Sequence, residues 1–288
     1  MKEMTTEELL KEIEENHNNS LFEEIFKRRN KELYRTSLFY KGTKINYLTL
    51  KYNVIRYAKA LKAYGIKKGD EIPICMANTP EFIYLLGGIS LIGAKANIFG
   101  EGFDKDYITE IINGCNSDIL FYDDDKYSVI DESVKNSKNK KIVLISLTES
   151  LLNGKNPYID LEKKWYDFKD RRNEIKDNSS RFIFSSEFLN LGKEYKGNYI
   201  EKVNLDDEFT ITYSSGSTNS SRPKAIVHDV KSYIVMGIYH DPKISKVPSM
   251  KNLRMLAHIP THSNTNIMSC ITDPLMQGSE VAVEPIYA

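Results

Sequence analysis

The chain has 288 residues, 41% of them hydrophobic and 28% charged, and its 40 basic residues balance 40 acidic ones. This composition is typical of a soluble globular protein, and the neutral charge gives no support for a nucleic-acid partner, which favours a basic surface. The three cysteines are far apart, the N-terminus lacks a secretory signal and no apolar run could cross a bilayer, so we expect a cytoplasmic protein without disulfides or a membrane span.

The N-terminal part of the chain is predicted to contain three helices and a strand. Thr5 and Glu8 have the spacing of a capping box, which predicts the start of a first helix. A second helix is predicted from Leu21 to Arg29, and a strand from Ser37 to Tyr40. Apolar residues at helical spacing predict a third helix from Thr49 to Tyr64.

Strand and helix patterns alternate along the rest of the chain. Strands are predicted at 71–76, 94–99, 119–122, 141–145, 209–213, 225–228, 253–258 and 281–284, and helices at 79–92, 105–113, 230–239 and 265–276. Between 148 and 202 the signal is weak, and the charged stretch Asp160–Lys176 around Trp165 is interpreted as a solvated helix or a surface insertion. The alternation predicts an α/β fold with mostly parallel sheets flanked by helices.

The segment from Tyr213 to His228 has the side chains of a phosphate-binding loop. A predicted strand leads into small hydroxyl residues around Gly216, which let a backbone approach a ligand closely and donate to phosphate oxygens. Lys224 adds a positive charge, but the segment lacks the Gly-Lys-Ser/Thr ending of a P-loop. A segment of this composition between two strands is also typical of a flexible turn.

In this order the segment resembles the phosphate-loop signature of the adenylate-forming superfamily, which includes acyl-CoA synthetases, nonribosomal adenylation domains and luciferases. The resemblance rests on Tyr213 to Thr218, Pro223, Lys224 and His228, and it differs at Asn219, at Ala225 and in two additional residues before Pro223. It implies that the phosphates of ATP are held by Ser214, Ser215, Gly216, Ser217, Thr218 and Lys224.

The resemblance extends along most of the chain. Lys68-Gly69-Asp70, Asn78 to Glu81, and Gly93-Ala94 are similar to scaffold segments of the family. Ala257 to Asn264 is similar to the segment that lines the acyl pocket, which implies that His262 is a substrate-pocket residue, whereas His258 is expected to be structural.

The resemblance implies activation of a carboxylic acid by ATP with Mg²⁺, and transfer of the acyl group to CoA or to the phosphopantetheine of a carrier protein. Residues 1–200 are predicted to form a first α/β subdomain with a helical lead and the charged insertion, and 201–288 to begin a second subdomain with the phosphate loop. The family's magnesium-binding Glu, its ribose-binding Asp and its small C-terminal domain have no match before Ala288. We therefore expect the N-terminal part of such an enzyme, with little or no turnover on its own.

Two alternatives stay open from the sequence. The chain could be a non-catalytic remnant or an interaction module that keeps the fold, which Asn219 and Ala225 favour. A phosphotransferase with an unusual loop fits less well, because the Gly-Lys-Ser/Thr ending is missing.

Overall fold

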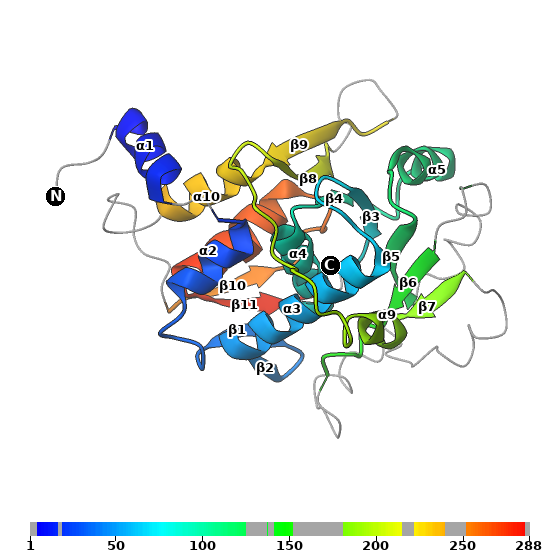
Figure 1. The fold of residues 1–288 in the computed structure, drawn as a ribbon, viewed down its shortest axis with the longest axis horizontal. Helices are drawn as coiled ribbons and strands as arrows, with labels where there is room; N and C mark the ends of the chain where they lie inside the picture. The colour runs from blue at the N-terminus through cyan, green and yellow to red at the C-terminus, as the bar shows by residue number, and fades with distance from the viewer. Residues whose placement is uncertain are drawn as a thin grey trace.

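The computed structural model describes residues 5–16, 19–124, 137, 141–151, 181–214, 222–239 and 252–285. In these ranges the chain forms two mostly parallel β-sheets flanked by helices (Figure 1), which confirms the predicted α/β class. The charged stretch Asp160–Lys176, with Trp165, lies outside the described residues.

The larger sheet has seven strands in the described part of the chain, in the order β7-β6-β5-β3-β4-β8-β9. All neighbours are parallel except β8 and β9. Because β4 and β5 lie on opposite sides of β3, the strand order reverses next to β3, and ligands of such sheets bind at the carboxyl ends of the strands there. The strands are β3 (Glu71–Cys75), β4 (Lys95–Ile98), β5 (Ile119–Asp123), β6 (Lys141–Ile145), β7 (Phe182–Phe184), β8 (Glu208–Tyr213) and β9 (Ala225–Asp229).

The smaller sheet contains β10, β11, β1 and β2 in that order. Its strands are β1 (Thr36–Tyr40), β2 (Thr43–Asn46), β10 (Arg254–Ala257) and β11 (Glu280–Val283). Lys41 and Gly42 join β1 to β2 with φ angles of 44° and 86°, as in a tight hairpin turn. The strand β2 was not predicted from the sequence. Both sheets take strands from both sides of Glu201, and the subdomain boundary near this residue stays a prediction.

Two adjacent helices, α3 (Tyr47–Tyr64) and α4 (Pro80–Ile92), pack against each other at the centre of the molecule (Figure 1). All 13 residues of α4 are buried, as expected for a helix that is apolar on all sides. The helix starts where the Thr79 hydroxyl accepts from the Phe82 N–H at 3.1 Å, and ends at Gly93 with φ 65°. Both ends were predicted.

The remaining helices lie around this core. They are α1 (Thr6–Asn16), α2 (Leu21–Arg28), α5 (Lys105–Gly114), α9 (Ser185–Leu191), α10 (Val230–Tyr239), the π-helix η2 (Asn266–Thr272) and α11 (Asp273–Gln277). The capping box of α1 is confirmed by reciprocal bonds between Thr5 and Glu8 of 2.7 and 3.2 Å. In the described ranges, no helix combines the length and the apolar character that crossing a membrane requires.

The prediction of one α-helix from 265 to 276 is wrong in type. The N–H of Asp273 donates to the carbonyl of Met268, five residues earlier, which is the π-helical pattern. Pro274 has no N–H to continue a regular ladder, so a short α-helix begins anew at Asp273.

Candidate active site

The segment that follows β10 crosses the carboxyl ends of the parallel strands. The carbonyl of His262 accepts from the N–H of Tyr213, the last residue of β8, at 3.3 Å. The Thr261 hydroxyl donates to the carbonyl of Met76, just after β3, at 2.6 Å. The Asn78 amide donates to the carbonyl of Ile259 at 2.8 Å. These bonds bring the end of β8 and the segment 259–262 to the edge where the strand order reverses.

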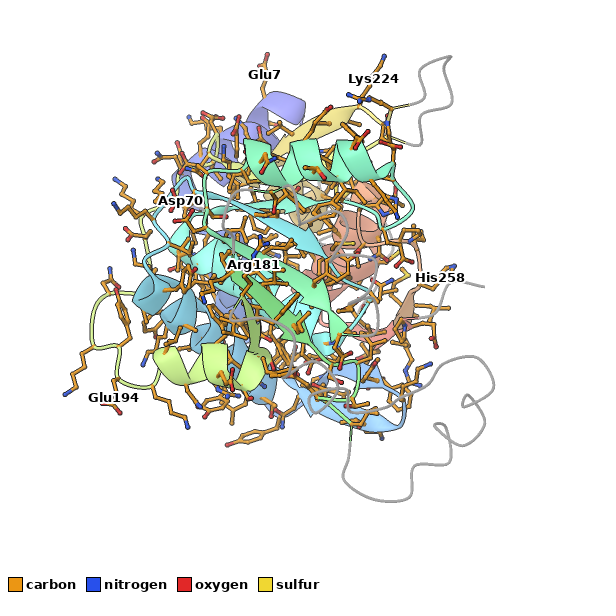
Figure 2. All side chains as sticks on the ribbon, turned by 90° about the vertical axis from the view of Figure 1, so that its right-hand side faces the viewer. Glu7, Asp70, Arg181, Glu194, Lys224 and His258 are labelled. Atoms are coloured by element: carbon orange, nitrogen blue, oxygen red, sulfur yellow. The ribbon has the colours of Figure 1, made fainter. Side chains whose placement is uncertain are left out.

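The two ends of the predicted phosphate loop are joined by reciprocal hydrogen bonds. The N–H of Ser214 donates to the carbonyl of Lys224, and the N–H of Lys224 donates to the hydroxyl of Ser214, both at 3.0 Å. Figure 2 shows the Lys224 side chain projecting away from the sheet. Its ammonium group makes no ion pair with another described residue. Ser215, Gly216, Ser217 and Thr218 lie outside the described residues, so their roles stay predictions.

His262 lines a cavity of about 210 Å³ at this edge. The cavity is lined by Cys75, Met76, Phe99, Gly100, Glu101, Gly102, Pro260, Thr261 and His262. Burial lowers the pKa of His262 and outweighs the opposite effect of Glu101, so the imidazole is neutral at pH 7. A Cβ atom on Gly100 would lie 2.8 Å from Cε1 of His262, so Gly100 leaves the space that the ring occupies.

Four rings form an aromatic cluster next to this cavity: Phe103, Tyr107, Tyr213 and His262. The Phe103 ring lies edge-to-face on Tyr213 at 5.4 Å and on His262 at 5.3 Å between centroids. The hydroxyl of Tyr213 donates to Oδ1 of the buried Asn97 at 2.8 Å. Phe103 and Tyr107 were not predicted as site residues. A sequence signal was available in Gly100-Glu101-Gly102, a Gly-rich turn directly after a predicted parallel strand.

Two other described histidines do not line this cavity. Nε2 of His228 lies 3.1 Å from the Thr212 hydroxyl, and burial lowers the pKa of this imidazole. His228 therefore links β9 to β8. His258 was expected on a strand, but β10 ends at Ala257 and His258 is exposed (Figure 2).

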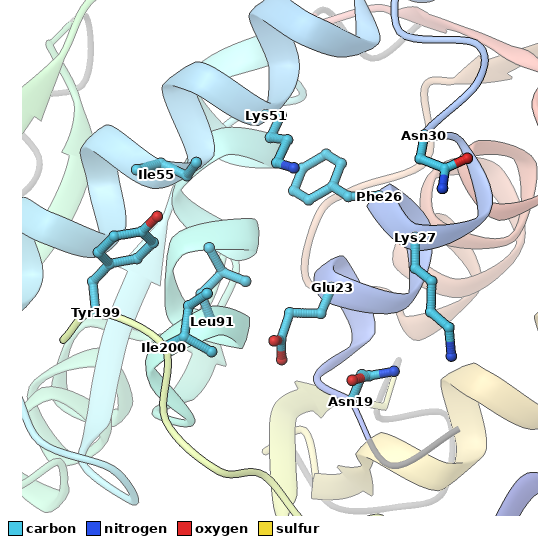
Figure 3. A pocket seen from close by; sticks show the side chains of 10 residues that line it. All are labelled: Asn19, Glu23, Phe26, Lys27, Asn30, Lys51, Ile55, Leu91, Tyr199 and Ile200. Carbon is cyan, nitrogen blue, oxygen red and sulfur yellow. The ribbon is translucent and has the colours of Figure 1, made fainter. Parts of the chain in front are cut away.

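The described residues contain no group of three or more His, Cys, Asp or Glu side chains that could hold a metal ion. A second cavity, of about 380 Å³, lies between α2, α3 and the segment Tyr199–Ile200 (Figure 3). The Lys51 ammonium lies 5.7 Å from the centroid of the Phe26 ring at its wall. None of the residues that line this cavity belongs to the loop or to the aromatic cluster.

Comparisons with known proteins show which family this chain is similar to. The family model described as "AMP-binding enzyme" matches residues 25–287. An acetyl-coenzyme A synthetase from Parvibaculum lavamentivorans is 30% identical over 192 residues, which cover 67% of this chain and 27% of that protein. A 3-hydroxypropionyl-coenzyme A synthetase from Sulfurisphaera tokodaii is 29% identical over 209 residues, covering 70% and 29%. The matched region therefore spans less than a third of these curated relatives.

Solved structures show the same fold at low sequence identity. The anthranilate CoA ligase AuaEII in complex with anthranoyl-AMP superposes with a TM-score of 0.68 at 16% identity, covering 93% of this chain and 45% of that one. The luciferase-like enzyme from the nonluminescent mealworm Zophobas morio gives a TM-score of 0.66 at 19% identity, covering 93% and 55%.

Proposed function

Because this chain belongs to the AMP-binding enzyme family, we propose that the protein activates a carboxylic acid with ATP. The carboxylate oxygen attacks the α-phosphorus, the bond to the β-phosphate breaks, and pyrophosphate leaves. A thiol, of CoA or of a carrier-protein phosphopantetheine, then attacks the acyl carbon and releases AMP. The names of the matched CoA synthetases support this reaction.

The observation that carries the proposal is the contact between Ser214 and Lys224. Two reciprocal bonds hold these residues opposite each other, and the Lys224 ammonium is not used by another described side chain. A cation and a hydroxyl at the ends of a hydroxyl-rich loop fit a chain of phosphates. In this proposal Ser214, Ser215, Gly216, Ser217, Thr218 and Lys224 hold the phosphates of ATP.

Mg²⁺ would neutralise phosphate charge on the bound nucleotide. We assign it no ligand among the described residues, because none of them form a metal-binding group. The neutral His262 is proposed to line the acid pocket by packing and hydrogen bonding rather than by charge. A cavity of about 210 Å³ suits a small acid better than a long acyl chain.

Exchange of labelled pyrophosphate into ATP tests the reaction, with Mg²⁺ and short acids such as acetate and 3-hydroxypropionate. Acid-dependent exchange, with AMP as the product once a thiol is added, supports the proposal. Formation of ADP would instead support a phosphotransferase.

Lys224→Ala tests the loop. We expect this variant to bind MgATP about tenfold or more weakly, because a charged hydrogen-bond donor to phosphate is lost. Lys44→Ala, which removes an exposed lysine from the smaller sheet, is the control and should bind normally. Equal affinity of Lys224→Ala and the unaltered protein would contradict the assignment.

A non-catalytic remnant is the competing proposal, favoured by Asn219 and Ala225 in the loop. A nucleotide that binds only the folded state raises the melting temperature. If neither ATP nor AMP, each with Mg²⁺, raises the melting temperature of the folded protein, the remnant is supported.

A further inference from the structure

The residues Arg222 to Lys224, here called the returning limb of the phosphate loop, lead back to β9 and contact α5. The hydroxyl of Tyr107, in the first turn of α5, donates to the carbonyl of Pro223 at 2.6 Å. The guanidinium of Arg222 pairs with the Glu110 carboxylate at 2.8 Å, and its Cζ lies 5.5 Å from the centroid of the Tyr107 ring. Both residues that precede Lys224 therefore contact α5.

The outgoing limb of the loop, Tyr213 and Ser214 at the end of β8, contacts the same helix. The Tyr213 ring lies edge-to-face on Tyr107, with centroids 6.1 Å apart. Phe103, which precedes α5, stacks on Tyr107 at 6.0 Å and also contacts Tyr213 and His262. One aromatic cluster thus touches the outgoing limb, the returning limb and the cavity at the carboxyl edge.

We propose that α5 positions the two described ends of the phosphate loop, with Tyr107 as the positioning residue. By holding Pro223, Tyr107 keeps Lys224 opposite Ser214 before a nucleotide arrives, so that the cation does not have to be ordered during binding. The nucleotide part of this inference rests on the proposed function, whereas the attachment of the limb to α5 does not.

Tyr107 is a more effective anchor than Glu110. The Arg222–Glu110 pair is exposed on both sides, with 52% and 55% of the two side chains accessible, and ion pairs of this kind contribute little. Tyr107 is half-buried, and burial raises the pKa of its hydroxyl, so the group remains a hydrogen-bond donor at any physiological pH. Its bond reaches the backbone carbonyl of Pro223 and so holds the backbone itself, whereas the ion pair holds only the side chain of Arg222.

The test is amide hydrogen exchange on Tyr107→Phe, which keeps the ring and removes the hydroxyl. The N–H groups of Ser214 and Lys224, which bond across the two limbs, should exchange about 3–10-fold faster than in the unaltered protein. The matched control is Tyr64→Phe, because the Tyr64 hydroxyl also donates to a distant backbone carbonyl, that of Asp118 at 3.3 Å. This control should leave exchange at Ser214 and Lys224 unchanged.

Glu110→Gln separates the two contacts with α5. It removes the ion pair to Arg222 but not the Tyr107 bond, so we expect a smaller increase in exchange than for Tyr107→Phe. Its control is Glu280→Gln, which removes the exposed pair with Arg254. Unaltered exchange in Tyr107→Phe, with the variant still folded, overturns the proposal.

The second readout is the kinetics of pyrophosphate exchange. In Tyr107→Phe the returning limb is less well ordered before binding, so the KM for MgATP should rise by up to about 3–10-fold. The maximal rate should stay within about twofold of that of the unaltered protein, because bound nucleotide orders the limb again. If Tyr107→Phe and Tyr64→Phe raised the KM for MgATP equally, the cause would be general destabilisation, and a positioning role of Tyr107 would be contradicted. If the unaltered protein binds no MgATP, the proposed function fails, while hydrogen exchange still decides whether α5 holds the loop.

Discussion

Glu81 at the start of α4 is a buried carboxyl group. As an acidic residue in the first helical turn it would be expected to be ionised and exposed, where it interacts favourably with the helix dipole. Its side chain is instead only 3% exposed and accepts a hydrogen bond from the Ser150 hydroxyl. Burial, and next the charge of Glu149, raise the pKa of Glu81 from 4.5 to about 8. At neutral pH the group is therefore mostly protonated.

This shift predicts a pH dependence of stability. Between pH 4.5 and about 8 the folded state retains a proton on Glu81 that the unfolded state has lost, so the free energy of unfolding falls as the pH rises. Glu81→Gln cannot ionise and should lack this decline, with a difference in slope of at most about 1.4 kcal/mol per pH unit. Urea unfolding of both proteins at pH 5, 6.5 and 8 measures it. Parallel slopes for the two proteins would show that Glu81 ionises normally.

At the scale of elements, two glycines determine how closely α3 and α4 approach. A Cβ atom on Gly88 would lie 2.9 Å from the backbone nitrogen of Ala58, and one on Gly87 would lie 2.6 Å from Cγ2 of Val54. Neither glycine has a positive φ, so both serve this contact rather than a special backbone conformation. At these two positions the backbone of α4 itself packs against α3, and a side chain on either glycine would collide with its neighbours.

Gly88→Ala should push α3 away from α4. We expect the free energy of unfolding to fall by about 1–3 kcal/mol, because the added methyl group meets backbone that cannot rotate away. Gly114→Ala in α5 is a matched control: its Cβ would meet nothing within 4 Å, and alanine favours the helix. Denaturant titration of both variants measures the difference, and a neutral Gly88→Ala would mean that the helices adjust.

The helices and strands that could be predicted are those whose own residues carry capping or hydrophobic signals. Thr79, Pro80 and Gly93 marked both ends of α4, and apolar runs marked the buried strands. The strands β2 and β7 were missed, because they have only 4 and 3 residues and depend on their neighbours in the sheets. The helix α9 was missed because it lies between 148 and 202, where the sequence signal is weak. The π-helix before Pro274 was missed because its apolar pattern is that of an ordinary helix.

In the candidate site, too, the loop could be predicted from its own residues, whereas its contact with a distant helix could not. The hydroxyl residues and Lys224 are contiguous in sequence and could be recognised as a loop. The hydrogen bond from Tyr107 to Pro223 joins residues 116 positions apart, and the pairing of β4 with β8 brings these two parts of the chain together. The Gly-rich turn at 100–102 marks this part of the chain, but no local pattern shows that Tyr107 contacts Pro223.

At the scale of the whole molecule, one hydrophobic core joins both sheets. Leu38 and Val281 of the smaller sheet and Phe121 of the larger sheet belong to the same cluster of buried residues, with α4 among them. Neither sheet can lose its packing without exposing the core of the other. The two sheets are therefore expected to unfold together.

Native-state hydrogen exchange tests this cooperativity. We expect amides of β1, such as that of Leu38, and of β5, such as that of Phe121, to open with the same free energy and the same denaturant dependence. Amides of α1 near the N-terminus should exchange at lower free energy, because its described residues, apart from Ile13, are exposed. Two distinct values for β1 and β5 would instead indicate separate folding units.

The parallel pairing of β1 with β11 has a consequence for the order of events during synthesis. Leu38 lies beside Val281, so a strand made early has its parallel neighbour only after some 240 further residues have been translated. Until then β1 has only the short hairpin with β2, which is marginally stable by itself. Folding on the ribosome is therefore expected to begin with α3, α4 and the strands β3 to β5, and the smaller sheet is completed last. During that interval the open edge of β1 is where a chaperone, or a second nascent chain, would bind.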